Sequence, residues 1–223
     1  DEEAALETVA SIKALGRRSG AYSGSVGTQT DDERIVGEVQ DDFDTVDILV
    51  HSAGVASRGN TVTDTDPDEV ERLWRVHALG AFNLSRLLLP GMRSRPRGDI
   101  VVVSSVTTRY MPARSVPYNM AKAAVDQMAR TAACELAEHR IRVNILHPGW
   151  TDTPGERKFF HDSELLEKGS ELPWGRLARP DEIARGVVFL CDPASDYING
   201  TTLSIDGGSL LPHEQMFRVA QRS

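Results

Sequence analysis

The sequence has few cysteines, no long apolar run and no excess of positive charge. Its two cysteines, Cys134 and Cys191, lie far apart without a Cys-x-x-Cys spacing, so neither a disulfide framework nor a zinc site is predicted. No stretch approaches the ~18–20 consecutive apolar residues of a membrane span, and no signal-peptide pattern opens the chain. The net charge of −8 disfavours nucleic acid and anionic membranes as main partners. We expect a soluble, cytoplasmic protein with a small-molecule ligand.

Short runs rich in Val and Ile alternate with long amphipathic segments, which is typical of a parallel sheet covered by helices. Neither a repeat nor a low-complexity linker interrupts the series, so residues 1–223 are predicted to form one α/β domain, a Rossmann-like doubly wound sheet in three layers. Segment 150–174 is predicted to be a mobile substrate lid with a short helix. Helices are predicted at 1–15, 31–41, 67–92, 117–139 and 180–191, and strands at 20–26, 47–51, 99–104, 141–146 and 201–205.

The most motif-like stretches follow directly after predicted strands. In open parallel sheets, ligands bind at the carboxyl ends of the strands. These stretches are therefore the candidate site. They read His51-Ser52-Ala53-Gly54, Ser104-Ser105, His147-Pro148-Gly149 and Asp206-Gly207-Gly208.

Tyr118 and Lys122 are predicted to lie on one face of a helix because they are four residues apart. A tyrosine with an ordinary pKa of ~10 is a poor base at neutral pH, but a nearby cation favours the phenolate, and Lys122 could supply that field. Alone, the Tyr-x-x-x-Lys pattern is weak, because composition produces it by chance in roughly one of every few chains of this length. Ser105 strengthens it, because this serine ends a buried strand just ahead of the tyrosine.

Taken in order, these motifs resemble those of the short-chain dehydrogenases/reductases. Ala53-Gly54 matches the second half of the family's Asn-Asn-Ala-Gly motif, and Pro148-Gly149 with Thr153 is similar to its Pro-Gly-x-x-x-Thr segment. Segment 175–184 and the Asp206-Gly207-Gly208 end also resemble the family, so the likeness covers nearly the whole chain. Within the family the chain looks most similar to glucose-dehydrogenase-type enzymes and 3-oxoacyl carrier-protein reductases.

The resemblance implies an NAD(P)-dependent oxidoreductase that interconverts an alcohol with a ketone or aldehyde. Tyr118 would exchange a proton with the substrate oxygen, Ser105 would hydrogen-bond that oxygen, and Lys122 would hold the nicotinamide ribose and lower the tyrosine pKa. Thr153 and the backbone near Thr151 would fix the carboxamide, and Trp150 would contact substrate. The resemblance further implies a homodimer or homotetramer, and no metal. The remaining cofactor contacts would come from Ser52, Ala53, Gly54, Pro148 and Gly149.

The chain departs from the family pattern at three places. His77 stands where the family has a relay asparagine, so its imidazole could join the relay or serve as a buried structural histidine. Thr28 stands where the family often has an aspartate that touches adenine. The glycine-rich turn that would cradle the pyrophosphate is missing; the glycines of segment 20–27 follow a helix and are interpreted as a turn and strand. Because the chain also begins at Asp1, we expect the natural protein to be longer by one strand-helix-strand unit.

Several alternatives stay open at this point. A cofactor-sensing protein without turnover could keep the fold, although it would need no proton relay, and an inactive structural piece would fit the missing start. The substrate could be a sugar or polyol, or a 3-oxoacyl compound, since aromatic residues near 150–160 suit either. NAD and NADP cannot be distinguished. The basic cluster Arg93, Arg95 and Arg97 could meet an acidic carrier or form a solvated helix end.

Overall fold

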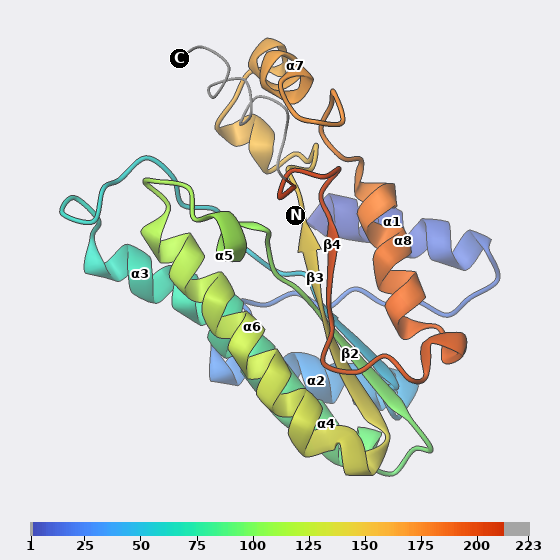
Figure 1. The fold of residues 1–223 in the computed structure, drawn as a ribbon. Helices are drawn as coiled ribbons and strands as arrows, with labels where there is room; N and C mark the ends of the chain where they lie inside the picture. The colour runs from blue at the N-terminus through green and yellow to red at the C-terminus, as the bar shows by residue number, and fades with distance from the viewer. Residues whose placement is uncertain (1, 212–223) are drawn as a thin grey trace, which may run out of the picture.

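The computed structural model describes residues 2–211 and contains one parallel sheet of four strands. The strands are ordered β1-β2-β3-β4 along the sheet, and each pairs in parallel with its neighbour. Helices cover both faces, α4 and α6 on one side and α8 on the other (Figure 1), so the predicted Rossmann-like α/β fold is confirmed. The strands are β1 (Ile48–His51), β2 (Gly98–Val103), β3 (Ile141–Pro148) and β4 (Thr202–Ile205).

The helices fall close to the predicted ranges. The structure adds a short helix after β2, which the sequence pattern did not indicate because it is only four residues long. Segment 150–174 contains a short α-helix, as predicted, and in addition a 3-10 turn. The helices are α1 (Glu2–Ala14), α2 (Gln29–Phe43), α3 (Pro67–Trp74), η1 (Arg75–Leu79), α4 (Gly80–Met92), α5 (Thr107–Tyr110), α6 (Val116–Leu136), η2 (Ala137–His139), η3 (Glu156–Lys158), α7 (Asp162–Ser170), α8 (Pro180–Cys191) and η4 (Pro193–Ser195).

The main core lies between the sheet and α6. Ala121, Val125, Ala129 and Ala133 recur every four residues along α6, and all are buried against the sheet. From the strands, residues such as Ile145 are fully buried in the same cluster. This packing fixes the rotation of α6 about its axis, and with it the direction in which the remaining side chains of the helix point.

The predicted helix 67–92 is interrupted by a π-helical turn. Pro67 opens α3, and the Asp66 side chain caps it by accepting a hydrogen bond from the Asp68 N–H at 3.0 Å. Residues Arg75–Leu79 then form the π-helical segment η1 before α4 begins at Gly80. Such turns occur frequently at functional sites, and this one carries the buried His77.

The strand predicted at residues 20–26 is wrong, because these residues have no regular structure. A strand needs a neighbour to satisfy its backbone groups, and within residues 2–211 no strand pairs with the outer side of β1. Segment 20–26 is held instead by α2 side chains: the Ser25 N–H donates to Asp31 at 2.9 Å, and Tyr22 donates to Asp42 at 2.5 Å.

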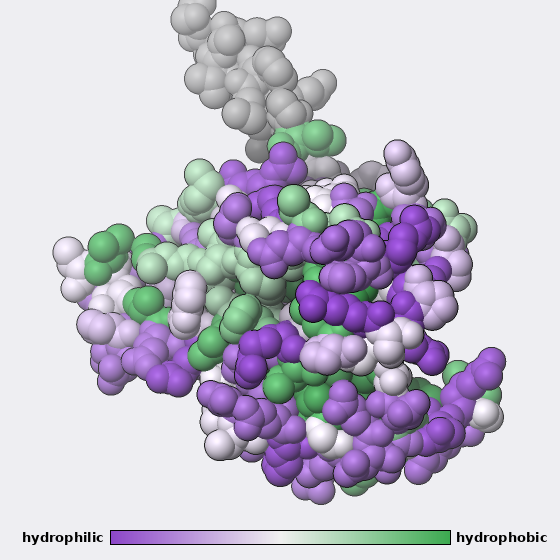
Figure 2. Space-filling model, turned by 90° about the horizontal axis from the view of Figure 1, so that it is seen from below, coloured by the Kyte–Doolittle hydropathy of each residue, from purple (hydrophilic) through white to green (hydrophobic). Residues whose placement is uncertain are grey.

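The outer side of β1 and helix α1 are loosely covered. Ile48 and Val50 of β1 remain 44% and 41% exposed. The predicted helix 1–15 is present as α1, but it has no buried residue among those described, and Asp1 and residues 212–223 lie outside the described range. In the view from below, hydrophobic residues show in the centre of the surface between hydrophilic rims (Figure 2). Within residues 2–211, the helices are all too short or too polar to cross a membrane.

Candidate active site

Three of the predicted catalytic residues meet beside the carboxyl end of β2. Ser105 lies two residues beyond the strand, is buried, and accepts a hydrogen bond from the Thr107 N–H at 3.2 Å. Tyr118 and Lys122 extend from the first two turns of α6, with the ammonium nitrogen 5.6 Å from the centre of the phenol ring. The three residues that the sequence spacing predicted to converge therefore lie close together.

Lys122 is buried, and its ammonium donates a hydrogen bond to the carbonyl of Val103 at 2.8 Å. The Ser104 hydroxyl in turn donates to the Lys122 carbonyl at 3.3 Å, so β2 and α6 are joined on both sides of the lysine. Burial lowers the pKa of Lys122 to about 8, and the charge of Asp126 opposes this change. An ammonium has three donors, so Lys122 retains donors that could reach ribose hydroxyls.

The pKa of Tyr118 is raised rather than lowered in this structure. Burial is the main cause, because an apolar environment disfavours the phenolate, and the Glu156 charge acts in the same direction. The hydrogen bond with Ser105 and the charge of Arg58 oppose it. The expectation that Lys122 lowers the tyrosine pKa therefore does not describe the net balance here. Arg58 and Glu156 are two charges near the phenol that the sequence motifs did not indicate.

His77 packs directly against the catalytic tyrosine. Its ring meets the Tyr118 ring edge to face, with centroids 5.5 Å apart, and its Nε2 lies 2.8 Å from the Val55 carbonyl oxygen. Burial, followed by the charge of Lys122, lowers the pKa of His77 to about 4, so the imidazole is neutral at physiological pH. The π-helical segment η1 thus inserts a neutral ring between the β1 end and the phenol.

The small residues after β1 have two different surroundings. Ser52 and Ala53 are exposed at the strand end, where a ligand could approach them. Gly54 is also exposed, but a Cβ atom there would lie 2.7 Å from Cε1 of His77. The position of His77 therefore favours glycine at position 54, in addition to any need to admit a nucleotide there.

A second buried histidine, His51, ends β1 near Lys122. Burial, and then the Lys122 charge, lowers its pKa to about 4. Its Nε2 and the Nδ1 of His77 have no hydrogen-bond partner in the part of the chain that the structure describes. The sequence indicates His51 only as part of the strand-end motif, because its proximity to Lys122 depends on how distant segments pack.

The predicted nicotinamide segment follows β3. The Gly149 N–H donates to the Ile205 carbonyl at 2.9 Å, and Thr151 Oγ1 donates to the Gly149 carbonyl at 3.0 Å, so Pro148 and Gly149 are held against the end of β4. Thr153 accepts the Glu156 N–H through its carbonyl at 3.0 Å, which turns the chain into η3. These residues and Trp150 lie at the same edge of the sheet as Ser105.

An aromatic cluster with an ion pair at its centre lies beyond this segment. Arg58 Nη2 is 3.0 Å from both carboxylate oxygens of Glu156, and Trp150 Nε1 donates to Glu156 at 2.7 Å. The rings of Trp150, Phe159 and Phe160 surround the guanidinium at 5.4 to 6.0 Å. The contact joins the loop after β1 to the predicted lid, 98 residues later in the sequence.

The residues present fit the nicotinamide end of a dinucleotide better than its phosphates. The exposed Ser52 and Ala53 and the free donors of Lys122 face the same strand ends as Gly149. Thr28 caps α2 and accepts the Asp32 N–H at 2.9 Å through its carbonyl, and the neighbouring Gly27 N–H donates to the Asp32 carboxylate at 3.2 Å. Among residues 2–211, a Thr-Gly-x-x-x-Gly-x-Gly turn of the kind that cradles a pyrophosphate is absent. Nor do these residues contain a group of His, Cys, Asp and Glu suited to a metal.

The basic cluster is largely neutralised. Arg95 pairs with Asp47 at 2.7 Å, and Arg97 pairs with Asp99 at 2.8 Å. These partners favour the interpretation as a solvated helix end over one as a docking site for an acidic carrier.

Known proteins resemble this chain in sequence over most of its length. A family model described as enoyl-(acyl carrier protein) reductase matches residues 1–209. A 3-oxoacyl-[acyl-carrier-protein] reductase of Thermotoga maritima is 33% identical over 184 residues, covering 80% of this chain and 72% of that protein. The chain spans 66% of the length of other curated relatives.

Two solved structures share the fold. A gluconate 5-dehydrogenase from Burkholderia cenocepacia, in complex with NADP and tartrate, superposes with a TM-score of 0.86 at 27% identity and covers 96% of this chain and 84% of that one. An L-sorbose reductase from Gluconobacter frateurii, in complex with NADPH and L-sorbose, gives a TM-score of 0.88 at 29% identity, covering 96% and 85%.

Proposed function

Because the chain belongs to the short-chain dehydrogenases/reductases, a family of NAD(P)-dependent oxidoreductases, we propose that it interconverts an alcohol and a carbonyl compound through a proton relay of Ser105, Tyr118 and Lys122. The observation that carries this proposal is the meeting of these three side chains at the carboxyl end of β2, with Ser105 bonded to the phenol and Lys122 5.6 Å from its ring. NAD or NADP, when bound, supplies or accepts the hydride.

The residues of the chain have separate roles in this reaction. In reduction, the Tyr118 phenol donates its proton to the substrate oxygen, while Ser105 holds that oxygen in place. A raised tyrosine pKa suits this direction, because the phenol stays protonated at neutral pH. In oxidation, the phenolate accepts the alcohol proton, and the charge of Lys122 stabilises it.

Contacts to the cofactor are proposed for both sides of the relay. Lys122 would hold the ribose hydroxyls with the donors it does not give to Val103, and Thr151 and Thr153 would lie beside the carboxamide. His77 would keep the phenol ring in place from the β1 side, as its edge-to-face contact suggests. Thr28, at the start of α2, would contribute at most to the adenine end.

For the substrate we favour a small polyhydroxylated compound of the sugar or polyol class. The cluster around Arg58 combines aromatic faces with a charged pair and an indole N–H, groups that suit stacking and hydrogen bonding with hydroxyls. The structural relatives with gluconate and L-sorbose in their names point in the same direction. A 3-oxoacyl substrate, suggested by the Thermotoga relative, is the second candidate.

The proposal is tested by turnover with NADH and NADPH on L-sorbose, 5-ketogluconate and a short 3-oxoacyl thioester. Replacing Tyr118 by Phe should lower kcat by about 10²–10⁴-fold, because the proton donor is lost while the ring remains. Fluorescence titration with NADPH and NADH checks that the variant still binds cofactor. Turnover of Tyr118→Phe at the wild-type rate would contradict the relay, and binding of both cofactors without turnover of any compound would favour a cofactor sensor.

A further inference from the structure

A line of polar side chains continues along α6 beyond the proposed relay. Tyr118, Lys122, Asp126 and Arg130 follow one another at intervals of four residues and so share one face of the helix. Asp126 is 4% exposed, whereas Arg130 lies at the surface. A carboxylate buried one turn behind the lysine requires partners, because an unpaired buried charge is strongly unfavourable.

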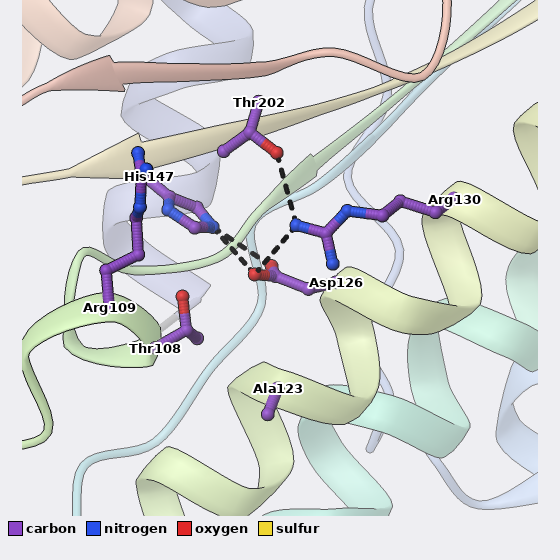
Figure 3. A pocket seen from close by; sticks show the side chains of 7 residues that line it. All are labelled: Thr108, Arg109, Ala123, Asp126, Arg130, His147 and Thr202. Atoms are coloured by element: carbon purple, nitrogen blue, oxygen red, sulfur yellow. Dashed lines mark hydrogen bonds and ion pairs between the residues drawn. The ribbon is translucent and has the colours of Figure 1, made fainter.

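The main partner is His147, the penultimate residue of β3. Its Nε2 lies 3.0 Å and 2.9 Å from the two carboxylate oxygens of Asp126, and the imidazole is 1% exposed. Arg130 approaches the same carboxylate at 3.6 Å and donates to Thr202 at 3.4 Å. Figure 3 shows these side chains, from α6, β3 and the start of β4, converging on Asp126. They line a surface cavity of about 420 Å³.

The pair stands between two parts of the proposed site. His147 directly precedes Pro148 and Gly149, so its bond to α6 ties the nicotinamide segment to the helix that carries the relay. Burial alone would raise the pKa of Asp126, but hydrogen bonds with His147 and nearby hydroxyls hold it below its ordinary value. The carboxylate therefore stays charged beside Lys122.

Three other titratable side chains, those of His51, His77 and Tyr118, lie near Lys122. His51 of β1 and His77 of η1 both have pKa values of about 4 and are neutral at pH 7. Tyr118 lies on α6 itself, and its pKa is raised. Arg109 and Arg130 border the cavity around Asp126. Asp126 is thus the negative charge that opposes the effect of burial on the lysine.

We propose that Asp126 and His147 are positioning residues of the proton relay: the buried Asp126 carboxylate holds Lys122 as a cation, and its hydrogen bond with His147 anchors the segment Pro148–Gly149 to α6. The inference rests on the proposed function and adds to it two residues that the family motifs do not name. It assigns Asp126 to electrostatic support of the lysine and His147 to anchoring of the segment after β3, rather than to contact with substrate.

The test is the pH profile of kcat/KM for carbonyl reduction, which needs Tyr118 and Lys122 both protonated, in Asp126→Asn. Without the carboxylate, Lys122 loses its proton at lower pH, so the alkaline limb of the profile should move down by about one pH unit. Glu135→Gln is the matched control, because it removes an exposed carboxylate from the same helix and should leave the profile in place. His147→Gln keeps the charge of Asp126, so its alkaline limb should not move down, although its thermal stability should fall.

A double variant keeps the proposal testable if Asp126→Asn alone does not fold. Asp126→Asn combined with His147→Asn allows an amide–amide hydrogen bond without a charge, and should show the same downward shift. If the folded variants lose rate by a constant factor at every pH, the pair is merely structural and the inference is overturned. If the wild type turns over and Tyr118→Phe does not, that failure leaves the proposed function standing. A wild type without turnover would overturn both.

Discussion

Helices α1 and α6 were both predicted from the amphipathic pattern of the sequence, but they differ in how many residues they bury. α6 buries eight of its 21 residues, among them Lys122 and Asp126, whereas α1 buries none of its 13. The β1 side of the sheet is likewise open at Ile48 and Val50, while Ile100 and Val102 of β2 are fully enclosed. The packing that stabilises the domain therefore also positions the proposed relay. Helix α1 has no comparable packing.

The largest effect on stability is expected in the core beneath the relay. Ile145 of β3 is completely buried in the cluster that holds α6, so Ile145→Ala should lower the free energy of unfolding by about 2–5 kcal/mol. Urea denaturation measures the change. A loss below about 1 kcal/mol would show that the α6 side is no better packed than the α1 side.

Acid should destabilise the relay side selectively. The pKa values of His51 and His77 fall from 6.5 to about 4 on folding, so the unfolded state binds more protons between these values and stability is lost as the pH falls from about 6.5 toward 4. At pH 5 each histidine should cost about 2 kcal/mol relative to pH 7. Denaturation at both pH values, in wild type, His51→Asn and His77→Asn, should show each variant losing part of the pH dependence. An unchanged difference in both variants would contradict it.

Adding one methyl group should have opposite effects at a closely packed glycine and at an open one. Gly54→Ala places a Cβ 2.7 Å from the His77 ring and should cost about 1–3 kcal/mol, a loss that His77→Ala should relieve. Gly37→Ala in α2 meets open space inside a helix and should stabilise by about 0.5–1 kcal/mol. Thermal denaturation of both variants and the double variant decides. Equal effects at both glycines would remove this distinction.

The smallest effect is expected in α1. Leu6 is 55% exposed, so Leu6→Ala should change the free energy of unfolding by no more than about 0.5 kcal/mol. The same urea experiment as for Ile145→Ala provides the comparison. A loss of 2 kcal/mol or more would mean that α1 is packed far more tightly than its exposure indicates.

The sequence pattern was sufficient for the sheet and most helices, because Val- and Ile-rich runs and amphipathic periods report burial directly. It failed at residues 20–26, where the pattern of a strand is present but a neighbouring strand is not, and it missed α5, which is too short to show a period. The range 67–92 was correct as helix, but a π-helical turn has no signature in the apolar spacing.

For the site, the spacing predicted that Ser105, Tyr118 and Lys122 lie together, because residues that are close in sequence at a strand end and the following helix remain close in the folded chain. It could not predict that Arg58 pairs with Glu156 or that Asp126 meets His147, because these contacts depend on how distant segments pack. The pKa of Tyr118 depends on burial and on the charges of Arg58 and Glu156, so its direction could not be predicted from spacing. The homodimer or homotetramer and the cytoplasmic location stay predictions.

The π-helical turn η1 also keeps α3 and α4 in angular phase. Each residue turns an α-helix by about 100°, and a π-helical turn absorbs one residue more than α-helical winding would within the same turn. Deleting a single residue within Arg75–Leu79 would restore plain α-helical winding with α3 and α4 still in phase, but the wider turn that carries His77 would be lost. A change in chain length, with every catalytic group retained, would then be enough to shift His77 relative to Tyr118.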